Sequence, residues 1–501
     1  MGSFVSINAA CLRGVEAVPV TVEVAMSGGI PSIHYVGMAD GSVLEGRQRV
    51  RSALRSAGYE LPRKNIVVNL TPGDIRKTGT GLDLAIAVGI LAGSGQIPLN
   101  GLEGALFVGE LTLDAMVRPV RGEVAYQILA RDTGRMLVGN WIYDHVELSG
   151  VRTGLLTGLG ELKGGLGEAL CAYPQGSATP PLRSVPLDYA DVIGQEGAKR
   201  ACVIAAVGGH GMLMIGAPGS GKTMLAQRLT TILPPIDPAV QQEALRIHSV
   251  AGEPIDGILG GERPFRSPHH TASAAGLLGG GRPVRPGEVS LAHGGVLFLD
   301  ELAEYPPSVL DTLRQPLEEG CVRIVRVDGT YTFPCSFQLV AASNPCPCGY
   351  LGDPEVPCRC SIASIERYRA RLSGPLLDRI DLILSITRPD AGQVLHGEQG
   401  LSSASMAEQV QRGRAFRGWR RARENGEAES GRAGEPGVGE VALRAREEGC
   451  ALAIARSQHL SARGLARLCR IARTIADLDE RPDVERRHIM EASMYGAEGR
   501  L

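Results

Sequence analysis

The first part of the chain alternates short apolar stretches with turn residues. The runs VPVTVEVAM and KNIVVNLTP show the two-residue periodicity of half-buried strands, and the stretch SVLEGRQRVRSALRSAG between them has helical spacing. This pattern predicts an α/β or α+β domain over residues 1–170. Residues 171–189 are rich in Pro, Ser and Gly and have no periodic apolar face, which predicts a linker.

Residues 190–388 show a different pattern, in which strands alternate with glycine-rich loops and helices. The apolar runs MLMI, GGVLFLDEL and FQLVAASN have the length of buried strands, and such βαβ repetition predicts a parallel sheet covered by helices. Over residues 389–501 the spacing becomes helical, which predicts a helical lid. A Gly/Glu-rich tract at about residues 424–439 interrupts this lid, and we expect a flexible insertion there.

Composition narrows the class of protein. A chain of 501 residues with 44% hydrophobic and 21% charged residues is typical of a globular protein of several domains. It has no apolar stretch of about 18 residues and no secretory signal pattern at its start, so we expect a cytoplasmic protein without membrane contact. The net charge of −2 provides no bulk attraction for nucleic acid, so such a partner requires a local basic surface.

Residues 216–223, GAPGSGKT, match the phosphate-binding pattern G-x-x-x-x-G-K-[ST] between an apolar strand and a helix. The glycines let backbone N–H groups surround phosphates, Lys222 reaches the β- and γ-phosphates, and the Thr223 hydroxyl binds Mg²⁺. ATP and Mg²⁺ are therefore the predicted cofactors. The predicted nucleotide-binding residues are Gly216, Ala217, Pro218, Gly219, Ser220, Gly221, Lys222 and Thr223.

Polar residues follow the next two apolar runs. Asp300 and Glu301 end the run VLFLDE, where Asp300 is predicted to hold Mg²⁺ and Glu301 to polarise the attacking water. Asn344 ends the run QLVAASN and is predicted to orient that water beside Glu301. An acidic pair after an apolar run is common in α/β proteins, and an Asn before Pro345 also suits a simple turn.

Four cysteines crowd into a short Gly/Pro-rich stretch. They form two C-x-C pairs, Cys346 with Cys348 and Cys358 with Cys360, separated by nine residues. Two close thiolate pairs can complete a tetrahedral zinc site, which we favour, while free structural thiols and a redox function remain alternatives.

An arginine-rich run lies in the helical region and suits either a solvated helix face or nucleic-acid contact. It comprises Arg412, Arg414, Arg417, Arg420, Arg421 and Arg423, interleaved with Phe416 and Trp419.

The order of several motifs resembles that of a known family. The runs GQEGAKRA, GAPGSGKTMLA, RPFRSPHHT, PGEVSLAHGGVLFLDEL, NPCPCGY and RLSGPLLDRIDL, together with KTGTGLDLAIAVGIL and GELTLDAMVRPVRG, resemble the magnesium-chelatase-like AAA+ ATPases of the ComM/YifB family. The resemblance implies a P-loop AAA+ core with a parallel sheet and a helical lid. It also implies that a Lon-protease/S5-like α+β domain precedes that core.

The resemblance assigns roles to two arginines. Arg379, in LLDRIDL, resembles the finger that a neighbouring subunit inserts beside the transferring phosphoryl group, and Arg463, in LSARGLARL, resembles the sensor-2 arginine that couples the lid to the γ-phosphate. In the N-terminal domain, Thr78 and Thr80 stand where Lon-like peptidases carry a Gly-Pro-Ser segment. Because a Ser-Lys peptidase needs that serine, we do not expect proteolysis.

The Arg- and Gly-rich segment before Asp300 resembles the helix-2 insert of the chelatase/MCM branch, which projects into a central pore. Arg263, Arg266, Arg282 and Arg285 are therefore expected to contact DNA phosphates. His269 and His270 of the same segment suit phosphate contact or a structural, hydrogen-bonded role.

The resemblance implies a homo-oligomeric, hexameric motor that moves along single-stranded or branched DNA. In this family such a DNA helicase drives branch migration in recombination during natural transformation. One rival is a chelatase-type ATPase that drives metal insertion through a partner, and another is an ATP-dependent protease-like remodeler. The fused N-terminal domain and the C-x-C pairs favour the motor, and the missing serine disfavours the protease.

Overall fold

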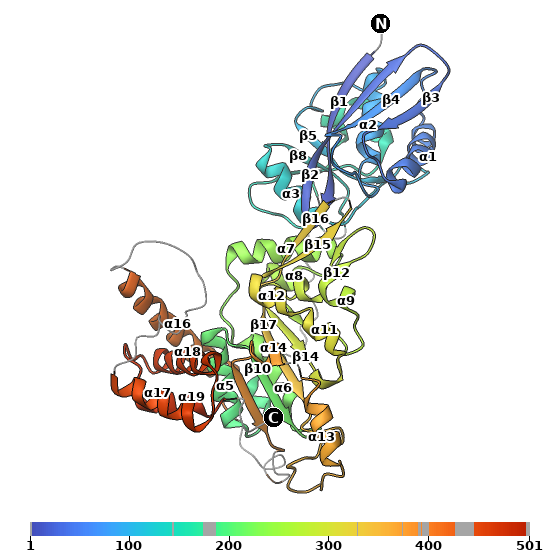
Figure 1. The fold of residues 1–501 in the computed structure, drawn as a ribbon. Helices are drawn as coiled ribbons and strands as arrows, with labels where there is room; N and C mark the ends of the chain where they lie inside the picture. The colour runs from blue at the N-terminus through green and yellow to red at the C-terminus, as the bar shows by residue number, and fades with distance from the viewer. Residues whose placement is uncertain are drawn as a thin grey trace.

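The computed structural model describes residues 3–142, 145–173, 187–327, 329–372, 374–388, 392, 400–425 and 445–496. An N-terminal unit occupies one end of the molecule, a second unit with its own sheet follows, and four C-terminal helices pack beside the second unit (Figure 1). Most of the predicted linker, residues 171–189, and of the predicted insertion at about 424–439 lies outside the described residues.

The N-terminal unit is built on a seven-stranded mixed sheet of order β3-β4-β2-β1-β5-β8-β9. Strands β1 and β2 form a long antiparallel hairpin, and the apolar helix α2 is buried against them because nearly all its residues are hydrophobic. The strands are β1 (Ser3–Arg13), β2 (Glu16–Ser27), β3 (Ser32–Val36), β4 (Asn65–Thr71), β5 (Ala105–Phe107), β6 (Glu110–Leu111), β7 (Val117–Arg118), β8 (Met136–Gly139) and β9 (Arg152–Leu155). The helices are α1 (Gly41–Ser56), α2 (Asp83–Gly93), α3 (Glu123–Asp132) and α4 (Leu166–Ala169).

The second unit has a five-stranded sheet of order β11-β14-β17-β10-β18, in which all neighbours run parallel. The predicted α/β class with a parallel sheet is confirmed, and β11 and β18 join the three strands that the apolar runs predicted. Its sheet strands are β10 (Met212–Gly216), β11 (Phe265–Arg266), β14 (Val296–Leu299), β17 (Gln338–Ser343) and β18 (Leu382–Ile386). Two further pairs are β12 (Gly279–Gly280) with β13 (Arg285–Pro286), and β15 (Cys321–Arg326) with β16 (Gly329–Pro334).

Helices cover both faces of this sheet, as parallel strands require. They are α5 (Glu196–Gly208), α6 (Lys222–Arg228), α7 (Pro238–Ala251), α8 (Asp256–Leu259), α9 (Ala274–Leu278), α10 (Glu288–Leu291), α11 (Pro307–Asp311), α12 (Arg314–Glu319), α13 (Ile362–Arg369) and α14 (Gly374–Leu377). The predicted helical lid consists of α16 (Ser403–Asn425), α17 (Ala445–Ser457), α18 (Ala462–Leu478) and α19 (Arg486–Ser493). The lid shares one apolar core with α5 and one face of the sheet, so it is anchored to the second unit.

The β15–β16 hairpin reaches from the second unit toward the turn between β1 and β2 (Figure 1). At this junction, Val15 of the turn packs in the same apolar cluster as Phe333 of the hairpin. Backbone hydrogen bonds join the units a second time, because Gly122 N donates to Ser249 O at 3.0 Å. The N-terminal unit is therefore held directly on the second unit at two places, the hairpin junction and the region where α3 meets α7.

Candidate nucleotide-binding site

The carboxyl ends of the parallel strands bring the predicted nucleotide residues to one edge of the sheet. Strand β10 ends at Gly216, its neighbour β17 is followed by Asn344, and β14, beyond β17, is followed by Asp300. This edge of an open α/β sheet is where ligands bind, because loops and helix N-termini meet there. The polar residues that follow the three apolar runs therefore lie at the same edge of the sheet.

The phosphate loop has the geometry that its glycines permit. Gly219 and Gly221 adopt φ angles of +78° and +90°, in the left-handed region that favours glycine. A Cβ added at Gly216 would lie 2.2 Å from the carbonyl oxygen of Ile386, so only glycine fits there. The buried hydroxyl of Ser220 has no hydrogen-bond partner among the described residues, and helix α6 begins directly after the loop. These features suit a phosphate group lying on the N-terminus of a helix.

Lys222 lies at the centre of the loop with 8% of its surface exposed. Its Nζ donates to the carbonyl oxygens of Gly216 at 2.7 Å and Ala217 at 3.0 Å, and lies 3.4 Å from Asn344 Oδ1. Burial lowers the pKa of Lys222, while the charges of Asp300 and Glu301 act in the opposite direction. The ammonium group is therefore held where a triphosphate chain would pass.

The two predicted Mg²⁺ ligands are in contact. Thr223 Oγ1 donates to Asp300 Oδ2 at 2.9 Å, although the residues are 77 positions apart. The other oxygen, Asp300 Oδ1, accepts from the backbone N–H of Glu301 at 2.9 Å, which orients the carboxylate. A hydroxyl and a carboxylate oxygen side by side are hard oxygen ligands of the kind that Mg²⁺ prefers.

Glu301 has a partner that the sequence did not indicate. Its Oε2 lies 3.1 Å from His270 Nδ1, and its side chain is 50% exposed. The neighbouring His269 is hydrogen-bonded to Thr271 Oγ1 at 2.8 Å. Both histidines therefore contact protein groups, in line with the structural, hydrogen-bonded role that was one of the two predictions for them. His270 directly contacts the predicted catalytic carboxylate. The sequence did not predict this contact because the strand that precedes the histidines, β11, is only two residues long.

The four nominated DNA-contacting arginines divide into two pairs. Arg263 donates to the backbone carbonyls of Pro234 and Gly294, and Arg266 forms ion pairs with Glu288 at 2.7 Å and Glu253 at 3.0 Å. These two guanidinium groups are occupied by protein partners. The other pair, Arg282 and Arg285, is exposed around the β12–β13 turn.

The arginine-rich run lies on α16, where three of its members turn inward. Arg414 donates to Ala206 O at 2.8 Å, and Arg417 donates to Val207 O at 2.9 Å, so both cap the C-terminus of α5. Arg420 forms a bidentate ion pair with Asp477 of α18 at 2.8 and 3.0 Å. Arg414 and Arg417 thus hold the lid to the core, and Arg420 joins two lid helices, roles that neither sequence-based alternative included.

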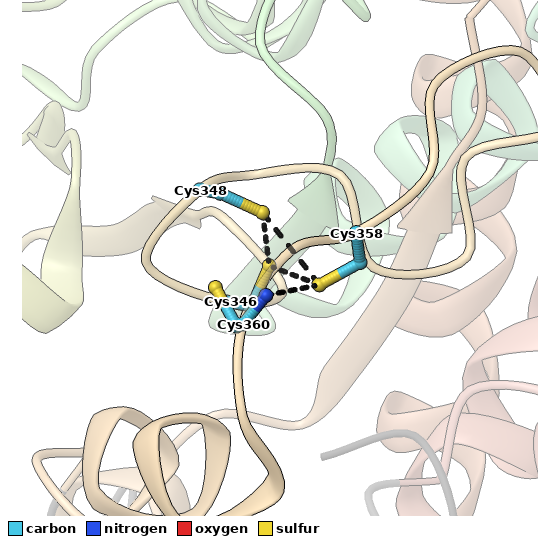
Figure 2. Close-up of side chains that lie close together, drawn as sticks. All are labelled: Cys346, Cys348, Cys358 and Cys360. Carbon is cyan, nitrogen blue, oxygen red and sulfur yellow. Dashed lines mark hydrogen bonds between the residues drawn. The ribbon is translucent and has the colours of Figure 1, made fainter.

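The four cysteines of the loop after β17 come together, as Figure 2 shows. The Sγ atoms of Cys346 and Cys348 are 3.4 Å apart, and Cys358 Sγ lies 3.7 Å and 3.6 Å from them. With Cys360, all four sulfur atoms lie within 4.8 Å of one another. A tetrahedron of thiolates around zinc, with Zn–S bonds of about 2.3 Å, has S–S edges of about 3.8 Å. The cluster has nearly that size.

Three family models match successive parts of the chain. The model described as magnesium chelatase, subunit ChlI, matches residues 188–394. Subunit ChlI of Mg-chelatase matches residues 22–140, and the ChlI C-terminal model matches residues 400–496. The matched segments thus cover the N-terminal unit, the parallel sheet and the lid in order.

Full-length relatives show the same likeness. The chain is 40% identical over 507 residues to the uncharacterized protein YifB of Escherichia coli (strain K12), with 97% of this chain and 96% of YifB covered. It is 37% identical over 504 residues to competence protein ComM of Haemophilus influenzae (strain Rd), with the same shares covered. The chain belongs to the magnesium-chelatase-like ComM/YifB family. A 29% match over 159 residues to the magnesium-chelatase 67 kDa subunit of Chlorobaculum parvum covers 31% of this chain and 23% of that subunit.

Within this ComM/YifB chain, Arg379 lies at the opposite edge of the sheet from the phosphate loop. The backbone N–H groups of Asp381 and Leu382 donate to the carbonyl of Gly211, which immediately precedes β10. Strand β10 is five residues long, so roughly 15 Å separates this edge from Gly216. Arg379 pairs with Glu318 there and does not face the phosphate loop of its own chain.

Arg463 lies on the same edge as Arg379. Its Nη1 donates to Asp378 Oδ2 at 2.7 Å, and its side chain is 69% exposed. Both predicted arginines therefore face one pocket of this ComM/YifB chain, and each is paired with a carboxylate. The pocket is lined by Asp378, Arg379, Asp381, Arg463, Ala466 and Arg470.

A buried ionic cluster fixes the lid of this ComM/YifB chain beside that pocket. Asp381 accepts from Arg470 of α18 at 2.9 Å and lies 2.7 Å from His210 Nδ1. Burial by itself would raise the pKa of Asp381, but the hydrogen bond and charge of His210, together with Arg470, lower it to about 2. The other ring nitrogen of His210 lies 2.8 Å from Thr474 Oγ1. Helix α18, which carries Arg463, is thus tied to the ends of β10 and β18.

Two polar groups near the N-terminal threonines have partners within the protein. Thr80 Oγ1 donates to Glu110 Oε2 at 2.7 Å, so its hydroxyl is already engaged. The adjacent Lys77 is fully buried and donates to the carbonyl of Pro72. The Thr80 hydroxyl and the Lys77 ammonium are therefore paired with other protein groups and not with each other.

Proposed function

We propose that this protein is an ATP-hydrolysing motor that assembles as a homo-hexamer and moves along DNA. The observation that carries the proposal is the meeting of Lys222, the Thr223–Asp300 pair and Asn344 at one edge of the parallel sheet. Membership in a family of AAA+ ATPases supports it. The expected cofactors are ATP and Mg²⁺.

Each residue of the site has a separate task. Lys222 neutralises charge on the β- and γ-phosphates, and the phosphate-loop N–H groups orient them. Thr223 and Asp300 would hold Mg²⁺, which would supply positive charge to offset that of the phosphates. Glu301 accepts the proton of the attacking water and Asn344 positions that water. His270 restrains the carboxylate of Glu301 through Oε2 at 3.1 Å.

The position of Arg379 and Arg463 supports the proposed oligomer. Neither arginine reaches the phosphate loop of its own chain, because they lie at the amino edge of the sheet. A head-to-tail ring would set this edge of one subunit against the carboxyl edge of the next, completing each nucleotide site. Both arginines would then act on the neighbour's phosphates.

The DNA track rests on Arg282 and Arg285 and on the similarity to a protein named competence protein ComM. Exposed arginines on a turn suit phosphate contacts, which supply affinity without sequence preference. We therefore propose a helicase that drives branch migration in recombination of transforming DNA. The deciding experiment compares the ATPase rate of the purified oligomer without DNA and with single-stranded, duplex and branched DNA. ATP hydrolysis that no DNA alters, combined with no DNA binding at low salt, would favour the chelatase-type rival.

Replacing Arg282 and Arg285 together by alanine should weaken DNA binding and abolish most DNA stimulation, with basal hydrolysis unchanged. Each lost single-strand phosphate contact should make the slope of log K against log salt shallower by about 0.7. Fluorescence anisotropy across a salt series measures this slope. A matched pair of exposed arginines on α1, Arg51 and Arg55, provides the control. Equal losses in both double variants would show that general charge, not the β12–β13 turn, binds DNA.

We also propose that the four-cysteine loop holds one structural Zn²⁺. Protein purified without chelator should contain about one zinc per chain by mass spectrometry of the metal, because two C-x-C pairs offer four thiolates of tetrahedral size. Changing Cys346 and Cys348 to serine should remove it. The exposed Cys171 lies in the N-terminal unit, so Cys171→Ser should leave the zinc content unchanged. Zinc-free protein with full ATPase activity would contradict the proposal.

A further inference from the structure

The cysteine loop lies directly against the phosphate loop. Residues 344–361 connect β17 to α13, and apart from Cys346, Gly349 and the Asp353 side chain they are half-buried or exposed. So exposed a segment cannot maintain its shape through an apolar core, and a metal cross-link would supply what the core lacks. The loop therefore has a defined conformation next to the nucleotide site for a reason other than packing.

Two contacts reach Pro218, in the middle of the phosphate loop, one from the cysteine loop and one from Arg388. A Cβ added at Gly349 would lie 2.6 Å from Pro218 Cδ, so the Gly349 backbone packs on the proline ring without room for a side chain. From the end of β18, Arg388 donates from Nε and Nη2 to the carbonyl oxygen of Pro218, at 3.1 and 3.0 Å. Both contacts act on the residue that precedes Gly219 and so fix the start of the N–H cradle.

Arg388 is itself held by the cysteine loop. Its guanidinium lies 5.5 Å from the centre of the Tyr350 ring and 3.8 Å from Asp353 Oδ2. Asp353 is oriented in turn, since its other oxygen accepts from the N–H groups of Glu355 at 3.0 Å and Val356 at 2.9 Å. Tyr350, Asp353 and Val356 all lie between the two C-x-C pairs. The chain of contacts thus runs from the cysteines through Asp353 and Arg388 to the phosphate loop.

We propose that metal binding by the four cysteines sets the affinity of the phosphate loop for nucleotide, with Arg388 as the positioning residue that transmits it. The proposal rests on the proposed ATP and zinc sites and adds a dependence of the first on the second. With metal bound, the cysteine loop presses on Pro218 through Gly349 and restrains Arg388. Without it, the Pro218 carbonyl loses its fixed donor and the N–H cradle is no longer preorganised.

The first test changes the connection and leaves the metal site intact. Arg388→Ala should keep one zinc per chain and the wild-type melting temperature, yet raise the Kd for a fluorescent ATP analogue about tenfold, the effect of losing a charged hydrogen bond. Arg388→Lys retains one hydrogen-bond donor, so its Kd for the analogue should lie between those of the wild type and Arg388→Ala. Arg359→Ala removes an exposed arginine between Cys358 and Cys360 and serves as the control. An unchanged Kd in Arg388→Ala would overturn the proposal.

The second test changes the metal and leaves Arg388 intact. Cys358→Ser/Cys360→Ser should lose zinc and bind the analogue at least as weakly as Arg388→Ala, whereas Cys171→Ser should match the wild type. Wild-type protein stripped with a zinc-selective chelator and returned to Mg²⁺ should lose affinity and regain it with one equivalent of Zn²⁺. Loss of zinc with unchanged affinity would overturn the coupling. A wild-type protein that holds zinc but binds no nucleotide would refute the proposed function instead.

Discussion

Replacing Lys222 by alanine is expected to reduce ATP hydrolysis by more than about 10³-fold, because the pocket then lacks the cation that offsets charge on the transferring phosphoryl group. The side chain is 8% exposed and surrounded by phosphate-loop carbonyls, so no solvent cation replaces it. Steady-state phosphate release measures the loss. Lys64→Ala, which removes an exposed lysine of the N-terminal unit, is the control.

Glu301→Gln separates binding from chemistry at the same site. The amide keeps the size of the side chain but cannot accept a proton, so nucleotide should bind normally while turnover falls about 10²- to 10⁴-fold. Nucleotide affinity and single-turnover hydrolysis measured on the same preparation distinguish the two effects. Near-normal turnover in either purified variant, with folding confirmed, would contradict the assignment of the site.

Mixing Arg379→Ala with Lys222→Ala subunits should restore activity that neither variant has alone. The amino edge of the sheet, where Arg379 lies, is roughly 15 Å from the phosphate loop of its own chain, so we expect Arg379 to act on the neighbouring nucleotide site. Removal of such a finger costs about 10³–10⁵ in rate in comparable enzymes. At equal proportions about one quarter of the interfaces in a ring join an intact loop to an intact finger, whatever the ring size. ATPase activity against mixing ratio measures the rescue.

The same mixture made with Arg463→Ala asks whether the lid arginine also acts on the neighbour. Rescue by Lys222→Ala subunits is expected, because Arg463 shares the pocket of Arg379. Arg456→Ala, an exposed arginine of α17, should be active without mixing. Absence of rescue at every ratio, with mixed rings confirmed by native mass spectrometry, would place the arginine's action within its own subunit.

The nucleotide residues were open to prediction because their geometry is local or topological. A contiguous glycine motif sets its own backbone, and the carboxyl ends of parallel strands meet at one edge of a sheet whatever the side chains between them. That is why Lys222, Asp300 and Asn344 were identified from three separate apolar runs. The contacts of Lys222 with Asn344 at 3.4 Å and of Thr223 with Asp300 at 2.9 Å lie at that edge.

The partners of the arginine side chains could not be predicted from the sequence in this way. Arg388 and Pro218 are 170 positions apart, and Arg414 reaches a carbonyl 208 positions away. A long side chain with five N–H donors binds whichever carbonyl or carboxylate the fold brings near, and no periodicity in the sequence encodes that choice. The same applies to His270, whose partner Glu301 belongs to another strand.

The sequence by itself determined the class of fold, the phosphate loop, the acidic strand end and the spacing of the four cysteines, since each depends on residues close together in the chain or on strand polarity. Only the tertiary structure decided the partners of the arginines and the place of the cysteine loop. Protein carbonyls and carboxylates bind Arg263, Arg266, Arg414 and Arg417. Arg379 and Arg463 share the amino edge of the sheet, and the cysteine loop lies against Pro218. The physical reason is that backbone conformation is set by local sterics, whereas the partner of a charged side chain is set by packing between distant segments.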